Sequence, residues 1–109
     1  MSTDLAAKEC VPCRGGVPPL EGRELEELHR ELDAGWEVVD EHHLEKAFEL
    51  EDWVSAVDFV DEIARLAEEQ GHHPDLHLSW GRVGVQIWTH KIDGLTESDF
   101  ILAAKIEEL

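Results

Sequence analysis

The chain has 109 residues, a hydrophobic fraction of 42% and a formal net charge of −17, with 26 acidic residues against nine basic ones. This length fits one domain with one modest core, and the apolar content is that of a globular protein rather than a disordered one. A surface this acidic repels phosphate backbones and anionic lipid head groups, so we expect no direct contact with nucleic acid and none with a membrane.

The first half of the chain predicts one helix and two strands after an irregular start. Residues 1–19 include "CVPCRGGVPPL", crowded with proline and glycine, which predicts an irregular lead-in ahead of a domain over residues 20–109. In "LEGRELEELHRELDAG" the leucines recur at steps of three and four, which predicts a short amphipathic helix that stops at Gly35. The alternation in "WEVVDEHHLEKAFEL" predicts two short strands joined by a polar turn near residues 40–42.

The second half predicts a longer helix, a hairpin and a final helix. The segment "EDWVSAVDFVDEIARLAEEQG" has the strongest helical periodicity. Its expected inward stripe consists of Trp53, Val57, Val60, Ala64 and Ala67, widened by Ala56, Phe59 and Ile63. "PDLHLSW" and "RVGVQIWTH" alternate on either side of Gly81, which predicts a β-hairpin. In "TESD", Thr96 is the expected N-cap of the last helix and Asp99 its capping-box partner.

The order helix, two strands, helix, two strands, helix predicts an α+β fold. Strands with one polar and one apolar face favour an antiparallel sheet that is covered on one side only. We therefore expect a four-stranded antiparallel sheet with three helices packed on one face (α-β-β-α-β-β-α).

Histidine is the residue type that points to a functional site. His72 and His73 follow a helix end in a segment that Pro74 forces to be extended, and His90 ends the last predicted strand on the same side as Trp88. Polar side chains at a sheet rim beside tryptophan form a candidate cluster. The other four histidines are expected on solvated faces or in turns: His29, His42, His43 and His77.

Two kinds of chemistry suit such a cluster. Neutral imidazole is a common zinc ligand, and Cys10 and Cys13 have CxxC spacing, but the second half of a zinc-finger signature is missing. Metal binding is therefore the weaker interpretation, and we expect no metal site. Proton transfer is the other, because histidine takes and gives protons near neutral pH. A dehydration needs both acts, since one group removes a proton and another protonates the leaving hydroxyl.

The candidate residues also belong to one continuous motif, E-x3-H-H-P-x5-W-x9-H-x8-D. Its members are Glu68, His72, His73, Pro74, Trp80, His90 and Asp99. The motif resembles the active-site pattern of the pterin-4a-carbinolamine dehydratases, and the resemblance covers residues 20–109. The "GLTESD" before the last helix fits the same family. Leu76, His77 and Trp88 stand where relatives often have other side chains, so they are candidates for changing which pterin fits.

The resemblance implies an enzyme, a 4a-hydroxytetrahydrobiopterin dehydratase of the hydro-lyase class. It would convert 4a-hydroxytetrahydropterin, left by aromatic amino acid hydroxylases, to quinonoid dihydropterin. The implied catalytic residues are His72, His73 and His90, and the implied substrate-binding residues are Glu68, Pro74, Trp80 and Asp99. His73 or His72 is the expected general acid toward the 4a-hydroxyl and His90 the base, or the reverse. The family implies no metal and no organic cofactor, since the pterin is the substrate.

The resemblance also implies a homodimer formed by sheet extension, with tetramers in some members. An open edge strand makes such pairing physically reasonable. The second interpretation is a non-enzymatic dimeric binding or assembly factor, or a coactivator, on the same fold. The intact histidine motif favours the enzyme, because a scaffold does not need it. The sequence has no secretory signal and no apolar run of membrane-spanning length, which predicts a cytoplasmic protein.

Overall fold

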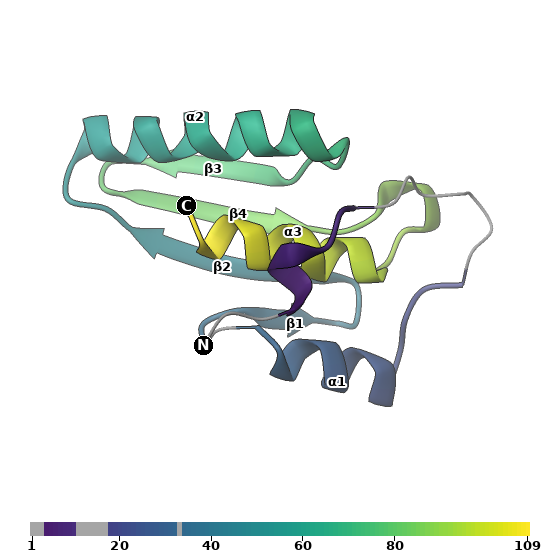
Figure 1. The fold of residues 1–109 in the computed structure, drawn as a ribbon. Helices are drawn as coiled ribbons and strands as arrows, with labels where there is room; N and C mark the ends of the chain where they lie inside the picture. The colour runs from purple at the N-terminus through teal and green to yellow at the C-terminus, as the bar shows by residue number, and fades with distance from the viewer. Residues whose placement is uncertain (1–3, 11–17, 33) are drawn as a thin grey trace.

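The computed structural model describes residues 4–10, 18–32 and 34–109, and Figure 1 shows its ribbon. The elements, with η for a 3-10 helix, are η1 (Asp4–Ala7), α1 (Arg23–Arg30), β1 (Glu37–Val39), β2 (His43–Glu49), α2 (Trp53–Gln70), β3 (Asp75–Ser79), β4 (Arg82–Ile87), η2 (His90–Ile92) and α3 (Glu97–Glu107). The strands form one antiparallel sheet in the order β1-β2-β4-β3. The predicted α+β fold, with three helices and a four-stranded antiparallel sheet, is confirmed.

Tight turns join the neighbouring strands. Asp40 and Glu41, between β1 and β2, both have left-handed backbone, with φ of 53° and 54°. Positive φ at both central residues is the hairpin geometry whose twist matches that of the flanking strands. In the hairpin between β3 and β4 the left-handed position is Gly81, with φ of 67°. Glycine adopts this conformation without the steric penalty of a Cβ atom.

One face of the sheet is apolar and lies against the helices. Leu44, Val83, Val85 and Ile87 are completely buried there. Figure 1 shows α3 across this face, with α2 on the β3 side and α1 on the β1 side. Residues 98–104 of α3 are all buried, so this helix is enclosed and not merely laid on the surface. Burial of apolar surface, at about 25 cal/mol per Å², is the main force that holds these layers together.

Helix α2 buries part of the inward stripe that its periodicity predicts. Ala56, Ile63 and Ala67 are buried, and Phe59 and Val60 pack against the core. Trp53 and Ala64 belong to the predicted stripe too, but Trp53 is 47% exposed and Ala64 is exposed. The apolar stripe is wider than the face that the sheet covers, so hydrophobic spacing alone does not show which of its edges stays in solvent.

The end of α1 also differs from the prediction. The helix ends at Arg30, and Gly35 lies beyond it with φ of 108°. A Cβ atom at Gly35 would lie 3.1 Å from Cε of Lys46. Glycine at this position therefore makes room for Lys46, whose ammonium pairs with Glu107 and lies 4.7 Å from the ring centroid of Phe48.

Part of the lead-in is packed onto the domain. Leu5 in η1 is 1% exposed and belongs to the core cluster that contains α3. The Nζ atom of Lys105 donates to the carbonyl of Ala6 at 3.0 Å, and Lys8 pairs with Glu97 at 3.0 Å. The first described residues are thus held by both ends of the last helix.

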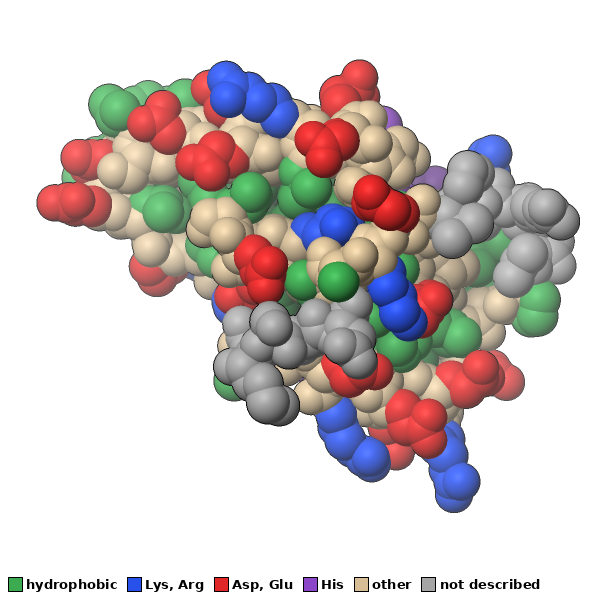
Figure 2. Space-filling model, viewed as in Figure 1, with side chains coloured by type: hydrophobic (Ala, Val, Ile, Leu, Met, Phe, Trp, Pro, Cys, Tyr) green, Lys and Arg blue, Asp and Glu red, His purple; other side chains and the backbone are tan. Residues whose placement is uncertain are grey.

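Acidic side chains dominate the visible surface. Figure 2 shows them scattered over the helix side of the molecule, with fewer basic side chains between them. This distribution agrees with the net charge of −17. Among the described residues, no helix combines the length and the apolar character needed to cross a bilayer.

The N-cap of α2 gives a pH-dependent prediction for stability. Oδ1 of Asp52 accepts from the backbone N–H of Ser55 at 2.8 Å, and this bond holds the pKa of the Asp52 carboxyl below its ordinary value. A carboxyl whose pKa is lower in the folded protein stabilises the fold at pH values above its pKa in the unfolded chain, about 3.9. This contribution is lost as the pH falls through the pKa of the folded protein.

Asp52→Ala should therefore lower the Tm at neutral pH, and its difference from the wild type should shrink below about pH 4. Asp52→Asn keeps a capping oxygen and should retain most of the Tm at neutral pH. Circular dichroism melts across this pH range measure both effects. Equal melting temperatures for the wild type and Asp52→Ala at neutral pH would contradict the assigned cap.

Candidate active site

A pocket of about 310 Å³ opens at one rim of the sheet. Its lining comes from residues 71–73, between α2 and β3, and from residues 88–91, after β4. Because β3 and β4 are antiparallel neighbours, the start of one lies beside the end of the other. Sheet pairing thus brings the three candidate histidines, His72, His73 and His90, to a single pocket.

Gly71 makes the turn that aims the first two histidines. It ends α2 in left-handed conformation, with φ of 65°, and the N–H of His72 donates back to the carbonyl of Ala67 at 3.1 Å. Glycine is favoured at this position because the conformation crowds any Cβ atom. After the turn the side chain of His72 is 14% exposed and that of His73 is 59% exposed. The two neighbours therefore present their rings in different surroundings.

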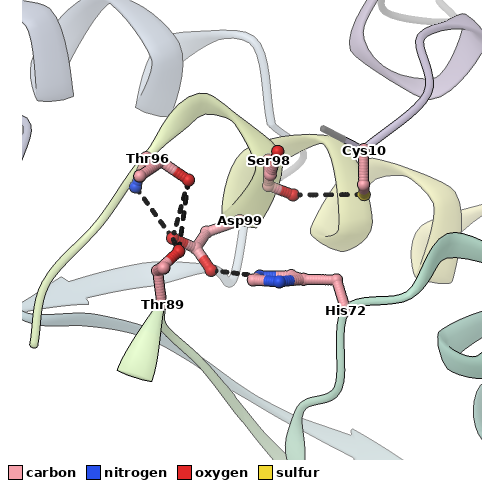
Figure 3. Close-up of polar contacts among 6 residues, drawn as sticks. All are labelled: Cys10, His72, Thr89, Thr96, Ser98 and Asp99. Atoms are coloured by element: carbon pink, nitrogen blue, oxygen red, sulfur yellow. Dashed lines mark hydrogen bonds and ion pairs between the residues drawn. The ribbon is translucent and has the colours of Figure 1, made fainter. Parts of the chain in front are cut away.

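A buried carboxylate holds His72 (Figure 3). Nε2 of His72 lies 2.5 Å from Oδ1 of Asp99, whose side chain is completely buried. Oδ2 of Asp99 accepts from the backbone N–H of Thr96 and from the hydroxyl of Thr89, each at 2.8 Å. Both carboxylate oxygens are therefore hydrogen-bonded, which is the condition under which a buried charge is tolerated.

This carboxylate also decides which nitrogen of His72 is available to a ligand. An ionised carboxylate has no proton to give, so Nε2 of His72 must donate. Nδ1 is then the nitrogen left to accept a proton when the ring is neutral and to donate one when it is charged. Asp99 thus fixes both the orientation and the tautomer of a ring that lines the pocket.

His73 has a carboxylate partner of its own. Its Nε2 lies 2.6 Å from Oε2 of Glu68, on the last turn of α2. Both side chains are largely exposed, so the pair adds little to stability. Its effect is to orient the ring of His73 at the mouth of the pocket.

His90 lies on the opposite lining segment, against an indole ring. It begins η2 instead of ending a strand as predicted, because β4 stops at Ile87 and the chain turns at Thr89. The ring centroids of Trp88 and His90 are 4.4 Å apart, with 46° between the planes. The pocket therefore has one polar segment with two imidazoles and a second with an imidazole on an aromatic surface.

Two residues of the sequence motif do not line this pocket. Trp80 lies in the turn between β3 and β4, at the far end of β3 from His73, and its side chain is 70% exposed. Pro74 lies next to His73 but is not among the lining residues. Within one chain the structure brings Glu68, the three histidines and Asp99 together, and leaves Trp80 apart.

Three further residues around the pocket and its tryptophan lie outside the predicted site. Thr89 is 3% exposed and bonds Asp99, and His42 and His43 pack against Trp88 with ring centroids 5.2 and 5.9 Å away. The alternation of side chains along a strand could have identified His43. Leu44 pairs with Ile87 and both face the core. His43 and Trp88, each one residue away along the chain, therefore lie on the opposite face of the sheet.

Cys10 lies close to the buried pair of His72 and Asp99. Its Sγ lies 3.5 Å from the carbonyl of Ser98, and its backbone N–H donates to Gln70 at 2.9 Å. Burial raises the pKa of the Cys10 thiol to about 11. Cys13, the second cysteine of the CxxC, lies outside the described residues. Within the part of the chain that the structure describes, no group of three or more His, Cys, Asp or Glu side chains is arranged to hold a metal.

Sequence comparison finds relatives that span the whole chain. The family model described as pterin 4 alpha carbinolamine dehydratase matches residues 18–109. A Rubrobacter xylanophilus protein named "putative pterin-4-alpha-carbinolamine dehydratase" is 60% identical, over 98% of this chain and 99% of its own length. A Rickettsia canadensis protein of the same name is 54% identical, over 96% of each chain.

Structure comparison finds the same architecture in a solved protein. The crystal structure of a transcriptional coactivator/pterin dehydratase from Brucella melitensis superposes with a TM-score of 0.77 at 34% sequence identity. The match covers 83% of this chain and 96% of the Brucella chain.

The Asp99 site predicts a large loss of stability on truncation. Asp99→Ala removes the acceptor for His72, Thr89 and the Thr96 N–H, and should cost roughly 3 kcal/mol, as is typical when buried polar partners are left unpaired. Glu97→Ala is the matched control on the same helix turn, because its exposed ion pair is worth at most about 1 kcal/mol. Urea unfolding measures both, and equal losses would refute the special role of Asp99.

The Cys10 environment predicts slow alkylation. In a Cys13→Ser variant, Cys10 is the single thiol, and its raised pKa keeps it protonated at pH 8. Its reaction with iodoacetamide should be about 100-fold slower than that of an unperturbed thiol and should accelerate up to about pH 11. A rate equal to that of free cysteine would show that the thiol is not buried in solution. Urea-unfolded protein is the control for intrinsic reactivity.

Proposed function

Because the chain belongs to the pterin 4 alpha carbinolamine dehydratase family, we propose that it removes water from a 4a-hydroxytetrahydropterin to give the quinonoid dihydropterin. In this proposal it recycles the pterin that aromatic amino acid hydroxylases use, as a cytoplasmic enzyme. The observation that carries the proposal is the pocket in which imidazoles from two separate segments meet beside an indole ring.

The reaction requires two proton transfers and no redox step. In a carbinolamine one carbon carries a hydroxyl group and a ring nitrogen. The C–O bond breaks as the hydroxyl takes a proton and leaves as water, the neighbouring nitrogen loses its proton, and a C=N bond forms. One general acid and one general base on different sides of the substrate therefore suffice, and histidine serves in either role near neutral pH.

We assign the acid and base to the two lining segments. His72 and His73 are held at Nε2 by Asp99 and Glu68, so Nδ1 of either ring is the nitrogen that acts on the substrate. His90, on the other segment, carries the complementary role. Asp99 and Glu68 act through the rings that they orient, and Asp99 does so from a completely buried position.

The shape of the pocket suits a planar heterocycle. A volume of about 310 Å³ is at the small end of the range typical of small-molecule sites. The partly buried Trp88 offers a flat aromatic wall, and aromatic rings gain from offset stacking. The proposal needs no metal and no organic cofactor, since the chemistry is proton transfer within the substrate.

A second candidate function is that of a dimeric coactivator or assembly factor. The name of the Brucella melitensis protein joins a transcriptional coactivator to a pterin dehydratase, and this favours keeping that candidate. The acidic surface in Figure 2 opposes direct contact with a nucleic acid, so the partner would be a protein. The histidine pocket has no use in this role.

A homodimer is part of the proposal for either function. β1 and β3 are the edges of the sheet, and the apolar side chains of Leu78 and Trp80 at the β3 edge are 39% and 70% exposed. An open edge with exposed apolar residues favours pairing with a second copy. Sedimentation equilibrium tests this, and a monomer at micromolar concentration would contradict it.

The enzymatic proposal predicts a histidine-dependent rate. The wild type should accelerate dehydration of freshly generated 4a-hydroxytetrahydropterin, followed by ultraviolet absorbance, and His90→Ala should lower kcat by about 100-fold or more. His72→Ala and His73→Ala should each lower it as well. His29→Ala removes a histidine on α1, outside the pocket, and should keep the wild-type rate. A folded His90→Ala variant with full activity would refute the assignment, and an inactive wild type would favour the coactivator.

A further inference from the structure

A second group of imidazoles surrounds the aromatic wall of the pocket. The ring centroid of Trp88 lies 5.2 Å from that of His42, 5.9 Å from that of His43 and 4.4 Å from that of His90. His42 and His43 come from the end of the β1–β2 turn and the start of β2, and His90 begins η2. The orientation of the indole is therefore set by rings from two other segments.

His42 and His43 are also the middle of a chain of polar contacts. Nε2 of His42 lies 2.7 Å from Oδ1 of Asp93, and the Nδ1 atoms of His42 and His43 are 3.0 Å apart. Nε2 of His43 lies 3.4 Å from Oε1 of Glu45. The chain therefore runs from a carboxylate at the end of η2, through two imidazoles, to a carboxylate on β2.

Counting hydrogens shows which protonation state completes this chain. Its three contacts need three hydrogens on the four ring nitrogens, because ionised carboxylates only accept. Two neutral imidazoles supply two N–H groups, so one contact stays without a hydrogen. Two imidazolium rings place two N–H groups head to head at Nδ1, which breaks the contact between the rings. The pair with one added proton is the form in which all three contacts are bonded.

Carboxylates lie at both ends of the pair. The pKa of Glu45 is held below its ordinary value mainly by a hydrogen bond from Gln86, with His43 and His77 contributing. The other titratable groups on the neighbouring elements are Glu37 on β1, Asp40 and Glu41 in the β1–β2 turn, His77 on β3, and His90 and Lys91 on η2. The side chains of His42 and His43 are 32% and 17% exposed, so solvent screens the pair only in part.

We propose that His42 and His43 are positioning residues for the pterin pocket, which hold Trp88 and the start of η2 in place when the pair carries one added proton. This inference rests on the proposed function, because it assigns Trp88 as the wall on which the pterin stacks. The bond from His42 to Asp93 ties the β1–β2 turn to the segment that begins with His90. Loss of the added proton leaves one contact unmade and loosens that wall.

The first test separates binding from chemistry. His42→Ala and His43→Ala should each raise the KM for 4a-hydroxytetrahydropterin by about three- to tenfold, the range expected when aromatic contacts are lost, and lower kcat less. The wild-type KM should rise as pH is raised from about 6 to 9, where histidine loses its proton, and both variants should lose this rise. His43→Asn places an amide where Nδ1 of His43 was and should recover part of the affinity without the pH dependence. His29→Ala, on α1 outside the pocket, should match the wild type.

Either of two kinetic results would overturn the proposal. One is an unchanged KM in both variants across the pH range, and the other is a fall in kcat as large as the fall in kcat/KM.

A second measurement needs no pterin, so the failure of the proposed function can be told apart from the failure of this inference. In ¹⁵N NMR of the folded protein, His42 and His43 should show one shared imidazolium and a change in the indole signal of Trp88 over the same pH range. Independent neutral tautomers, with no response of Trp88, would refute the pair. NMR could show the pair in a wild type that neither accelerates dehydration nor binds 7,8-dihydropterin in calorimetry. In that case the pterin function fails, and with it the role assigned to Trp88.

Discussion

The completely buried carboxylate of Asp99 is the interaction on which the pocket depends. It receives a hydrogen bond from each of three places: the turn after α2, the end of β4 and the start of α3. A charge with no exposed surface is tolerated only while such partners are present. Burial of Asp99 is therefore favourable only where the three segments meet. The stability of the fold and the geometry of the histidine pocket are in this way coupled through one side chain.

The sequence predicts most of the architecture because local patterns determine it. Alternation marks the strands, Gly81 marks the second hairpin turn, and Asp99 at the start of the last helix follows from the capping pattern. Periodicity does not show which edge of a wide apolar stripe stays exposed. On α2 the sheet covers Ala56, Ile63 and Ala67, all within the predicted stripe, and leaves Trp53 exposed.

The candidate site, like the fold, is predicted only in part by local sequence patterns. The fixed spacing of the motif identifies the residues of the pocket, but it does not show that Trp80 lies at the other end of β3. The rings of His42 and His43 contact Trp88 because β2 pairs with β4, a neighbour that lies more than thirty residues further along the chain. Contacts of this kind depend on strand register, which a single sequence specifies only weakly before the pairing is known.

The docking of η1 on α3 has a consequence for how the protein is made. Leu5 enters the core beside residues of the last helix, and Lys105 binds the carbonyl of Ala6. A chain that emerges from the ribosome amino end first holds these early residues without their partners until the final helix has left the exit tunnel. The nascent chain therefore exposes this apolar surface until α3 has been synthesised, and closure of the core is expected only once that helix has emerged.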